Sequence, residues 1–183
     1  MQLNHRSVPV VAQVQRAAGD AGDRLSAIVW RERRSEIGGL VWGRLYGSSA
    51  GPVVWIAAMT PGIGRGSAGE FEISPGSFVA GVRMLRAAGF PEGLEELGMW
   101  HSHPGYGVFL SAVDEEYFRL CYPQSSKVSI VIDPIRRERA IFVKSPLGIQ
   151  TIPGYIHDGV KFGAVPALDP YDAWDAVKDA ADE

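Results

Sequence analysis

LGMWHSHPGYGVFLSAVDEEYFRLCY, residues 97–122, decides the fold, because it predicts a strand, a loop and a helix in that order. LGMW is uninterrupted and apolar, as expected of a buried strand, and the alternation of side chains along a strand would place His101 and His103 on one face. The proline and glycines of HPGYG allow the chain to turn back after the strand. The helix predicted to follow Ser111 would therefore lie beside the two histidines.

His101, His103 and Asp114 are candidate ligands of a single divalent metal. Two imidazoles on one strand face can converge on an ion that lies about 2.0–2.1 Å from each nitrogen. With Asp114 as the third ligand, a fourth position stays open for water, which is typical of a catalytic zinc site and not of a structural one. Ser111-x-x-Asp114 also fits a helix cap, and both roles can hold because the cap would fix where Asp114 points.

A hydrolytic metal site also needs a group that takes a proton from water and returns it to the leaving amine. Glu36, in SEIGGLVWG, is one candidate, although it follows a predicted helix at the end where the helix dipole disfavours an anion. Glu32, Glu115 and Glu116 are its rivals. The residues alone leave this choice open.

Outside the central stretch, the order of the expected elements predicts a mixed α/β domain. The sequence around Gly38-Gly39 predicts the end of a helix, and residues 61–75 form a long glycine-rich connection. Helices are expected near residues 8–18, 22–34, 77–89 and 169–183, and strands near 40–47, 52–59, 127–133, 140–145 and 148–153.

Composition excludes several classes of protein. A net charge of −3 and the absence of a long Lys/Arg tract give no reason to expect a nucleic-acid partner. No apolar run approaches the length of a membrane span, and the first residues lack the apolar core of a signal peptide, so we expect no membrane partner and a cytoplasmic protein. The single cysteine, Cys121, excludes a disulfide framework within one chain and is expected to be buried as a small hydrophobic residue.

Glu36 before IGGLVWG, followed by HSHPGYGVFLSAVD, resembles the signature of the JAMM (MPN-plus) metalloproteases: Glu, then His-x-His-Pro, six residues, then Ser-x-x-Asp. SIVIDPIRRERAIFV is similar to the paired strands that follow this motif in deubiquitinating members of the proteasome lid and the signalosome. The resemblance implies an α/β fold with a single MPN (JAB)-like domain, in which helices flank a mixed, mostly antiparallel sheet of cytidine-deaminase-like architecture. We place a helical N-terminal extension at residues 1–19, the domain at 20–155 and a C-terminal extension ending in an acidic helix at 156–183.

The resemblance also implies a role for each motif residue. His101, His103 and Asp114 would hold one Zn²⁺ per chain, Glu36 would be the general acid/base, and Ser111 would donate a hydrogen bond to the developing oxyanion. The implied activity is that of a zinc-dependent isopeptidase, which releases ubiquitin or a ubiquitin-like protein from its conjugates by cutting after the C-terminal glycine. E1-like and E2-like conjugation proteins encoded nearby are possible partners.

Substrate recognition is expected at Phe71, Glu72 and Ile73, where the modifier's extended tail could add a strand to an exposed edge. The alternative for this segment is an edge strand in a flexible loop. Two other functions stay open: trimming of a ubiquitin-like or sulfur-carrier precursor, and a zinc-binding scaffold without turnover. The intact set of motif residues argues against the scaffold, and the single cysteine excludes a zinc deaminase, which needs a Cys-x-x-Cys pair.

Overall fold

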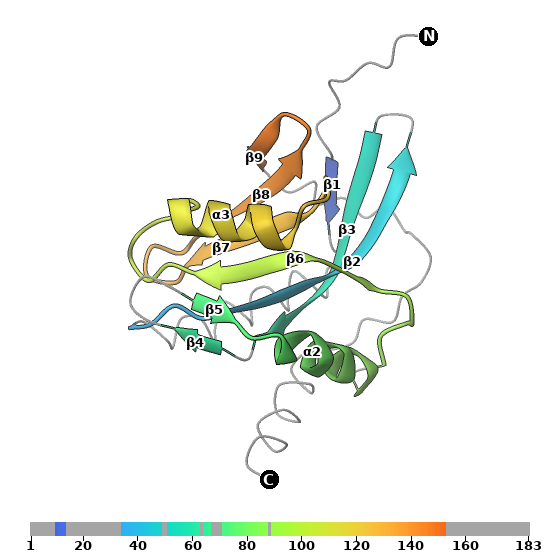
Figure 1. The fold of residues 1–183 in the computed structure, drawn as a ribbon, viewed down its shortest axis with the longest axis horizontal. Coiled ribbons are helices and arrows are strands. Elements are labelled where there is room, and N and C mark those ends of the chain that lie inside the picture. The colour runs from blue at the N-terminus through green and yellow to red at the C-terminus, as the bar shows by residue number, and fades with distance from the viewer. Residues whose placement is uncertain are drawn as a thin grey trace.

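The computed structural model describes residues 10–13, 34–48, 51–62, 64–66, 71–87 and 89–152, and the fold is built from these segments (Figure 1). Seven strands form the main sheet in the order β1-β3-β2-β6-β7-β8-β9, and β4 pairs with β5 in a separate two-stranded sheet. The strands are β1 (Val10–Gln13), β2 (Gly38–Ser48), β3 (Gly51–Pro61), β4 (Gly64–Gly66), β5 (Phe71–Ile73), β6 (Glu95–Ser102), β7 (Val128–Asp133), β8 (Glu138–Ser145) and β9 (Gly148–Ile152), and the helices are α2 (Gly76–Ala87) and α3 (Ala112–Cys121).

The pairing of the strands confirms a mixed, mostly antiparallel sheet. Antiparallel ladders join β2 to β3, β2 to β6, β7 to β8 and β8 to β9. Two ladders are parallel, β1 with β3 and β6 with β7. The chain reaches the parallel neighbour of β6 through α3, which lies in front of β7 in Figure 1. The central stretch therefore forms the predicted strand, loop and helix.

The two faces of β6 contact different parts of the molecule. Trp100 is 1% exposed and belongs to a large apolar cluster with Val41 and Ile130. Met99 lies on the opposite face, where Phe118 of α3 and Tyr122, the C-cap of this helix, pack against it. His101 shares the face of Met99, because side chains two positions apart point the same way. The packing of α3 on Met99 thus brings the start of the helix toward the histidine.

The helix expected near residues 8–18 is wrong at Val10–Gln13, which form strand β1. The β-branched valines suit a strand, and β1 covers an edge of β3 that would otherwise be unpaired. The helices expected at residues 22–34 and 169–183 lie almost entirely outside the described residues, as do His5 and His157. Neither α2 nor α3, the helices of the described part, is long and apolar enough to cross a membrane.

Gly38 and Gly39 begin strand β2, and the helix that they were expected to end lies almost entirely outside the described residues. Close approach explains both glycines. A Cβ at Gly38 would lie 2.6 Å from the ring of Phe71, and one at Gly39 would lie 1.9 Å from the carbonyl oxygen of Thr60. The pair therefore lets β3 and the β4–β5 hairpin pack tightly on the beginning of β2.

Cys121 is exposed, so the expectation that it is buried is also wrong. Phe118 of α3 and its C-cap residue Tyr122 point toward the sheet, and these side chains are 0% and 7% exposed. They fill the contact with Met99 and leave Cys121 on the side of the helix, where it lines a cavity.

Candidate metal centre and active site

The two motif histidines lie side by side at the end of β6. His101 and His103 are 4% and 3% exposed, and their Nε2 atoms are 3.1 Å apart. The backbone N–H of His103 donates to the carbonyl of Ile132 at 2.9 Å, which continues the pairing of β6 with β7 past the last strand residue. This continuation keeps both imidazoles on the face expected from the sequence.

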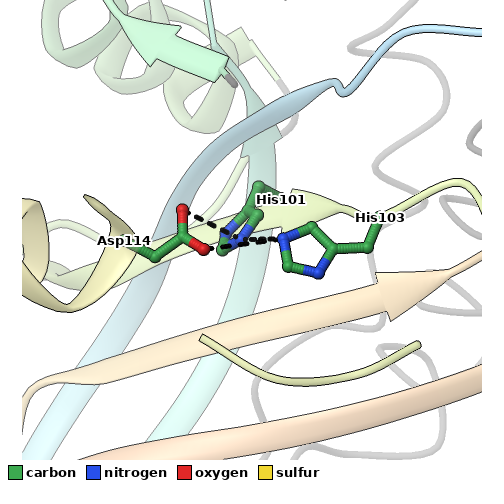
Figure 2. A group of neighbouring side chains, drawn as sticks. All are labelled: His101, His103 and Asp114. Atoms are coloured by element: carbon green, nitrogen blue, oxygen red, sulfur yellow. Dashed lines mark hydrogen bonds and ion pairs between the residues drawn. The ribbon is translucent and has the colours of Figure 1, made fainter. Parts of the chain in front are cut away.

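Asp114 reaches the histidines from the first turn of α3 (Figure 2). Its Oδ1 lies 3.5 Å from Nε2 of His101, and its Oδ2 lies 3.6 Å from Nε2 of His103. Ser111 caps the helix, since its Oγ accepts from the backbone N–H of Asp114 at 3.2 Å and its own N–H donates to Oδ2 of Asp114 at 2.8 Å. This capping box fixes the carboxylate in the direction of the histidines.

The donor set fits a divalent cation. One ligand atom each from His101, His103 and Asp114 lie within 4.8 Å of one another. Nδ1 of His103 lies 3.2 Å from the carbonyl oxygen of Gly107, so this nitrogen holds the proton and Nε2 presents its lone pair to the site. One positive ion would satisfy the two imidazole nitrogens and the carboxylate, which face one another at these distances.

The charges of the site also fit a divalent cation. Burial alone would raise the pKa of Asp114, but the adjacent imidazoles of His101 and His103 and the hydrogen bond from Ser111 hold it well below its usual range. Burial lowers the pKa of His103, but the hydrogen bond to Asp114 and the charge of Glu36 raise it above 6.5 overall. Asp114 is therefore an ionised ligand at neutral pH, while a proton on His103 competes with a metal.

Glu36 lies beside the candidate metal ligands, two residues before the start of β2. The backbone of Ile37 pairs with Ser102, since Ser102 N–H donates to Ile37 O at 2.8 Å and Ile37 N–H donates to Ser102 Oγ at 3.0 Å. Glu36 is 4% exposed, and its Oε1 lies 3.8 Å from Nε2 of His103. Glu36 and Ile37 themselves are not helical, and the helix predicted to end before them lies almost entirely outside the described residues.

The rival glutamates of the described region are placed differently. Glu115 pairs with Arg119 on the outside of α3 at 3.7 Å, and both side chains are about half exposed or more. Glu116 is exposed on the same helix. Glu32 lies outside the described residues. Among the acidic side chains that the structure describes, Glu36 and Asp114 are the ones paired with His103.

Ser111 has a second contact besides its cap. Its hydroxyl donates to Oδ2 of Asp114 at 2.7 Å, so the oxygen lies next to the ligand group. Ser102, which the sequence did not single out, is 0% exposed and joins the segment of Glu36 to β6. The sequence offers one signal for Ser102. It is a polar residue between the two histidines, and its side chain is expected on the opposite face of the strand.

Phe71, Glu72 and Ile73 form β5, at the side of the site. Phe71 packs its ring on Gly38, which is the register partner of His101. Glu72 is exposed, and Ile73 packs against the core under α2 and α3. A cavity of about 460 Å³ lies between β5, α2 and α3, with Ile73 on one wall and Tyr117 on another. Tyr117 follows Asp114 by one helical turn, so this cavity is close to the candidate ligands.

Comparison with known families supports the same assignment. The profile described as prokaryotic homologs of the JAB domain matches residues 20–143. COP9 signalosome complex subunit 5 of Eremothecium gossypii is 42% identical over 73 residues, which are 39% of this chain and 17% of that protein. The 26S proteasome regulatory subunit rpn11 of Schizosaccharomyces pombe is 35% identical over 104 residues, which are 55% of this chain and 32% of that protein.

Among solved structures, the solution structure of protein DSY2949 from Desulfitobacterium hafniense has a similar fold. The TM-score is 0.55 at 21% identity, over 78% of this chain and 90% of the other. This likeness supports the fold alone. The matches to the two curated relatives span a third of their length or less.

Proposed function

The chain belongs to the family of prokaryotic homologs of the JAB domain, and from this membership and the site geometry we propose that it is a zinc-dependent isopeptidase. Its substrate would be ubiquitin or a ubiquitin-like protein attached to a lysine, cut after the C-terminal glycine of the modifier. The main support is the position of Glu36, which lies against His103 although 65 positions separate it from His101. The similarity to the two curated subunits supports the same class of substrate.

His101, His103 and Asp114 would hold the ion. Zinc, when bound, would supply Lewis-acid activation of the scissile carbonyl and of the attacking water. Glu36 would accept the proton of that water at Oε1 and deliver it to the leaving amine of the lysine. The buried position of Glu36 favours this role, because few water molecules compete for its proton.

Ser111→Ala is expected to lower kcat by ~10²–10³-fold, the usual cost of losing one donor to a developing oxyanion. The same change removes the cap of α3, which costs about 1 kcal/mol in the free energy of unfolding. Activity measured well below the unfolding midpoint separates the two effects. A variant that loses only stability and keeps the wild-type kcat would refute the catalytic role of the hydroxyl.

We propose β5 as the place where the modifier's tail binds. In the described part of the chain, β5 pairs on one side only, with β4, so its other edge is open to an added strand. The cavity next to Ile73 could receive side chains of that tail.

Proline at Glu72 or at Ser74 is expected to raise KM for a lysine-linked substrate, since proline removes a backbone N–H. Alanine at the same positions changes the side chain and keeps the N–H, so these variants are the matched controls. KM values equal to wild type in both proline variants would exclude strand addition at β5.

Precursor trimming remains the second candidate for the same site. Rates on a linear fusion and on a lysine-linked conjugate of the same modifier, compared in parallel, distinguish the two. We further propose the cytoplasm as the site of action, with E1-like and E2-like proteins encoded nearby as partners. Genes for such proteins beside this one would support a dedicated conjugation system.

A further inference from the structure

Asp133 is a fully buried carboxylate outside the sequence motif. It is 0% exposed and ends β7. Its Oδ1 accepts from the backbone N–H groups of Ile135 at 2.9 Å, Gly105 at 3.0 Å and Arg136 at 3.0 Å. Its Oδ2 accepts from the N–H of Gly107 at 2.7 Å. Burial raises the pKa of Asp133, but these four donors lower it more, so the carboxyl is ionised at neutral pH.

Two of these donors belong to the loop that follows the second histidine. Gly105 and Gly107 have φ values of +86° and +90°, a conformation that only glycine adopts without strain. The conformation turns both N–H groups toward Asp133. The carbonyl of the same Gly107 accepts from Nδ1 of His103 at 3.2 Å. One residue therefore links the buried carboxylate to the imidazole.

We propose that Asp133 is a positioning residue for the metal site, which holds the ring of His103 through Gly107. With Gly107 fixed, its carbonyl keeps the proton of His103 on Nδ1 and directs Nε2 toward His101 and Asp114. Without this support, the loop and the ring lose their common orientation. This role rests on the proposed function only in so far as His103 is a metal ligand.

Asp133→Asn is a selective test, because it should remove the hydrogen bond from Gly107 and keep the other three. The side-chain oxygen of asparagine would take the place of Oδ1, where three donors converge. Its NH₂ group would then face the N–H of Gly107 and could not accept from it. Arg136→Gln is the matched control, because it removes the half-exposed guanidinium 3.7 Å from Oδ2 and leaves the loop bonds in place.

The experiment is a titration of the metal-free full chain with Co²⁺, whose visible absorption reports the number and arrangement of its ligands. Circular dichroism at the same temperature verifies that each variant is folded. We expect Asp133→Asn to bind Co²⁺ about tenfold more weakly, the low end for a residue outside the ligand shell, with an altered absorption band. Arg136→Gln should match the wild type in both readouts.

A folded Asp133→Asn protein with wild-type affinity and band would overturn the inference, as would an equal change in Arg136→Gln. A wild-type protein that binds no Co²⁺ would overturn the proposed function as well. A wild-type protein that binds Co²⁺ without cleaving any conjugate would overturn the proposed function alone, because the titration does not depend on turnover.

If Asp133→Asn does not fold, backbone hydrogen exchange of the wild type decides. The amide of Gly107 should exchange far more slowly than in an unstructured peptide, because it is buried and bonded to Asp133. Exchange at the unstructured rate would mean that the link between Asp133 and the loop is absent and would overturn the inference.

Discussion

Glu36→Gln is expected to lower kcat for a lysine-linked conjugate by about 10²–10⁴-fold, the usual contribution of a general acid/base. The amide has the shape of the carboxyl group but cannot accept the proton of the attacking water. Because Glu36 is buried against His103, an isosteric change avoids the cavity that alanine would leave. The measurement is kcat on ubiquitin and ubiquitin-like proteins joined through their C-terminal glycine to the ε-amino group of a lysine peptide.

Glu115→Gln is the matched control, since Glu115 is a glutamate close to Asp114 in sequence that pairs with Arg119 on the surface of α3. It should keep the wild-type kcat. The Co²⁺ affinity of Glu36→Gln should stay within a few-fold of wild type, which separates proton transfer from metal binding. Cleavage by Glu36→Gln at the rate of the Glu115→Gln control would rule out the acid/base assignment.

Removal of the metal is expected to abolish cleavage, and added Zn²⁺ should restore it. His103→Ala should be inactive at any zinc concentration, because it removes one of three ligands and the partner of Glu36. Zinc should also stabilise the wild type, by about 2.7 kcal/mol when its free concentration is 100 times Kd. Thermal unfolding with and without Zn²⁺ measures this gain, which His103→Ala should lack.

His157→Ala serves as the control for the loss of a histidine outside the motif, and it should retain both activity and zinc stabilisation. Full activity of the wild type after complete removal of the metal, verified by elemental analysis, would contradict a metal-dependent reaction. Inactivity that zinc does not restore would point to irreversible unfolding, which the circular dichroism spectrum of the metal-free protein detects.

The ligand group was the most predictable part of the site. His101, His103 and Asp114 follow from local rules, the two-residue period of a strand and the cap of a helix, and the structure brings them together. Glu36 could not be chosen from local rules, because its contact with His103 depends on the pairing of β2 with β6. Only the resemblance to a known signature distinguished it from the other glutamates.

The same limit explains the errors in the fold. Strands β2, β3, β7, β8 and β9 were predictable, since their apolar residues suit strands. Gly38 was interpreted as a helix end because glycine signals a break in local sequence, but nothing local shows that the ring of Phe71 also packs on it. Cys121 was assigned to the interior because nothing local shows that Phe118 and Tyr122 already fill the contact.

The pairing of β2 with β6 has a consequence for how this sequence can vary in length. Gly38 faces His101, and the register shifts once, between Val41 and Trp42. Deleting one residue between Glu36 and this bulge would move the glutamate to the opposite face of the sheet, since side chains alternate. An insertion in the turn between β2 and β3 leaves that pairing untouched. Homologous chains that keep the activity should therefore vary in length at the turn and hold a constant distance from the glutamate to the bulge.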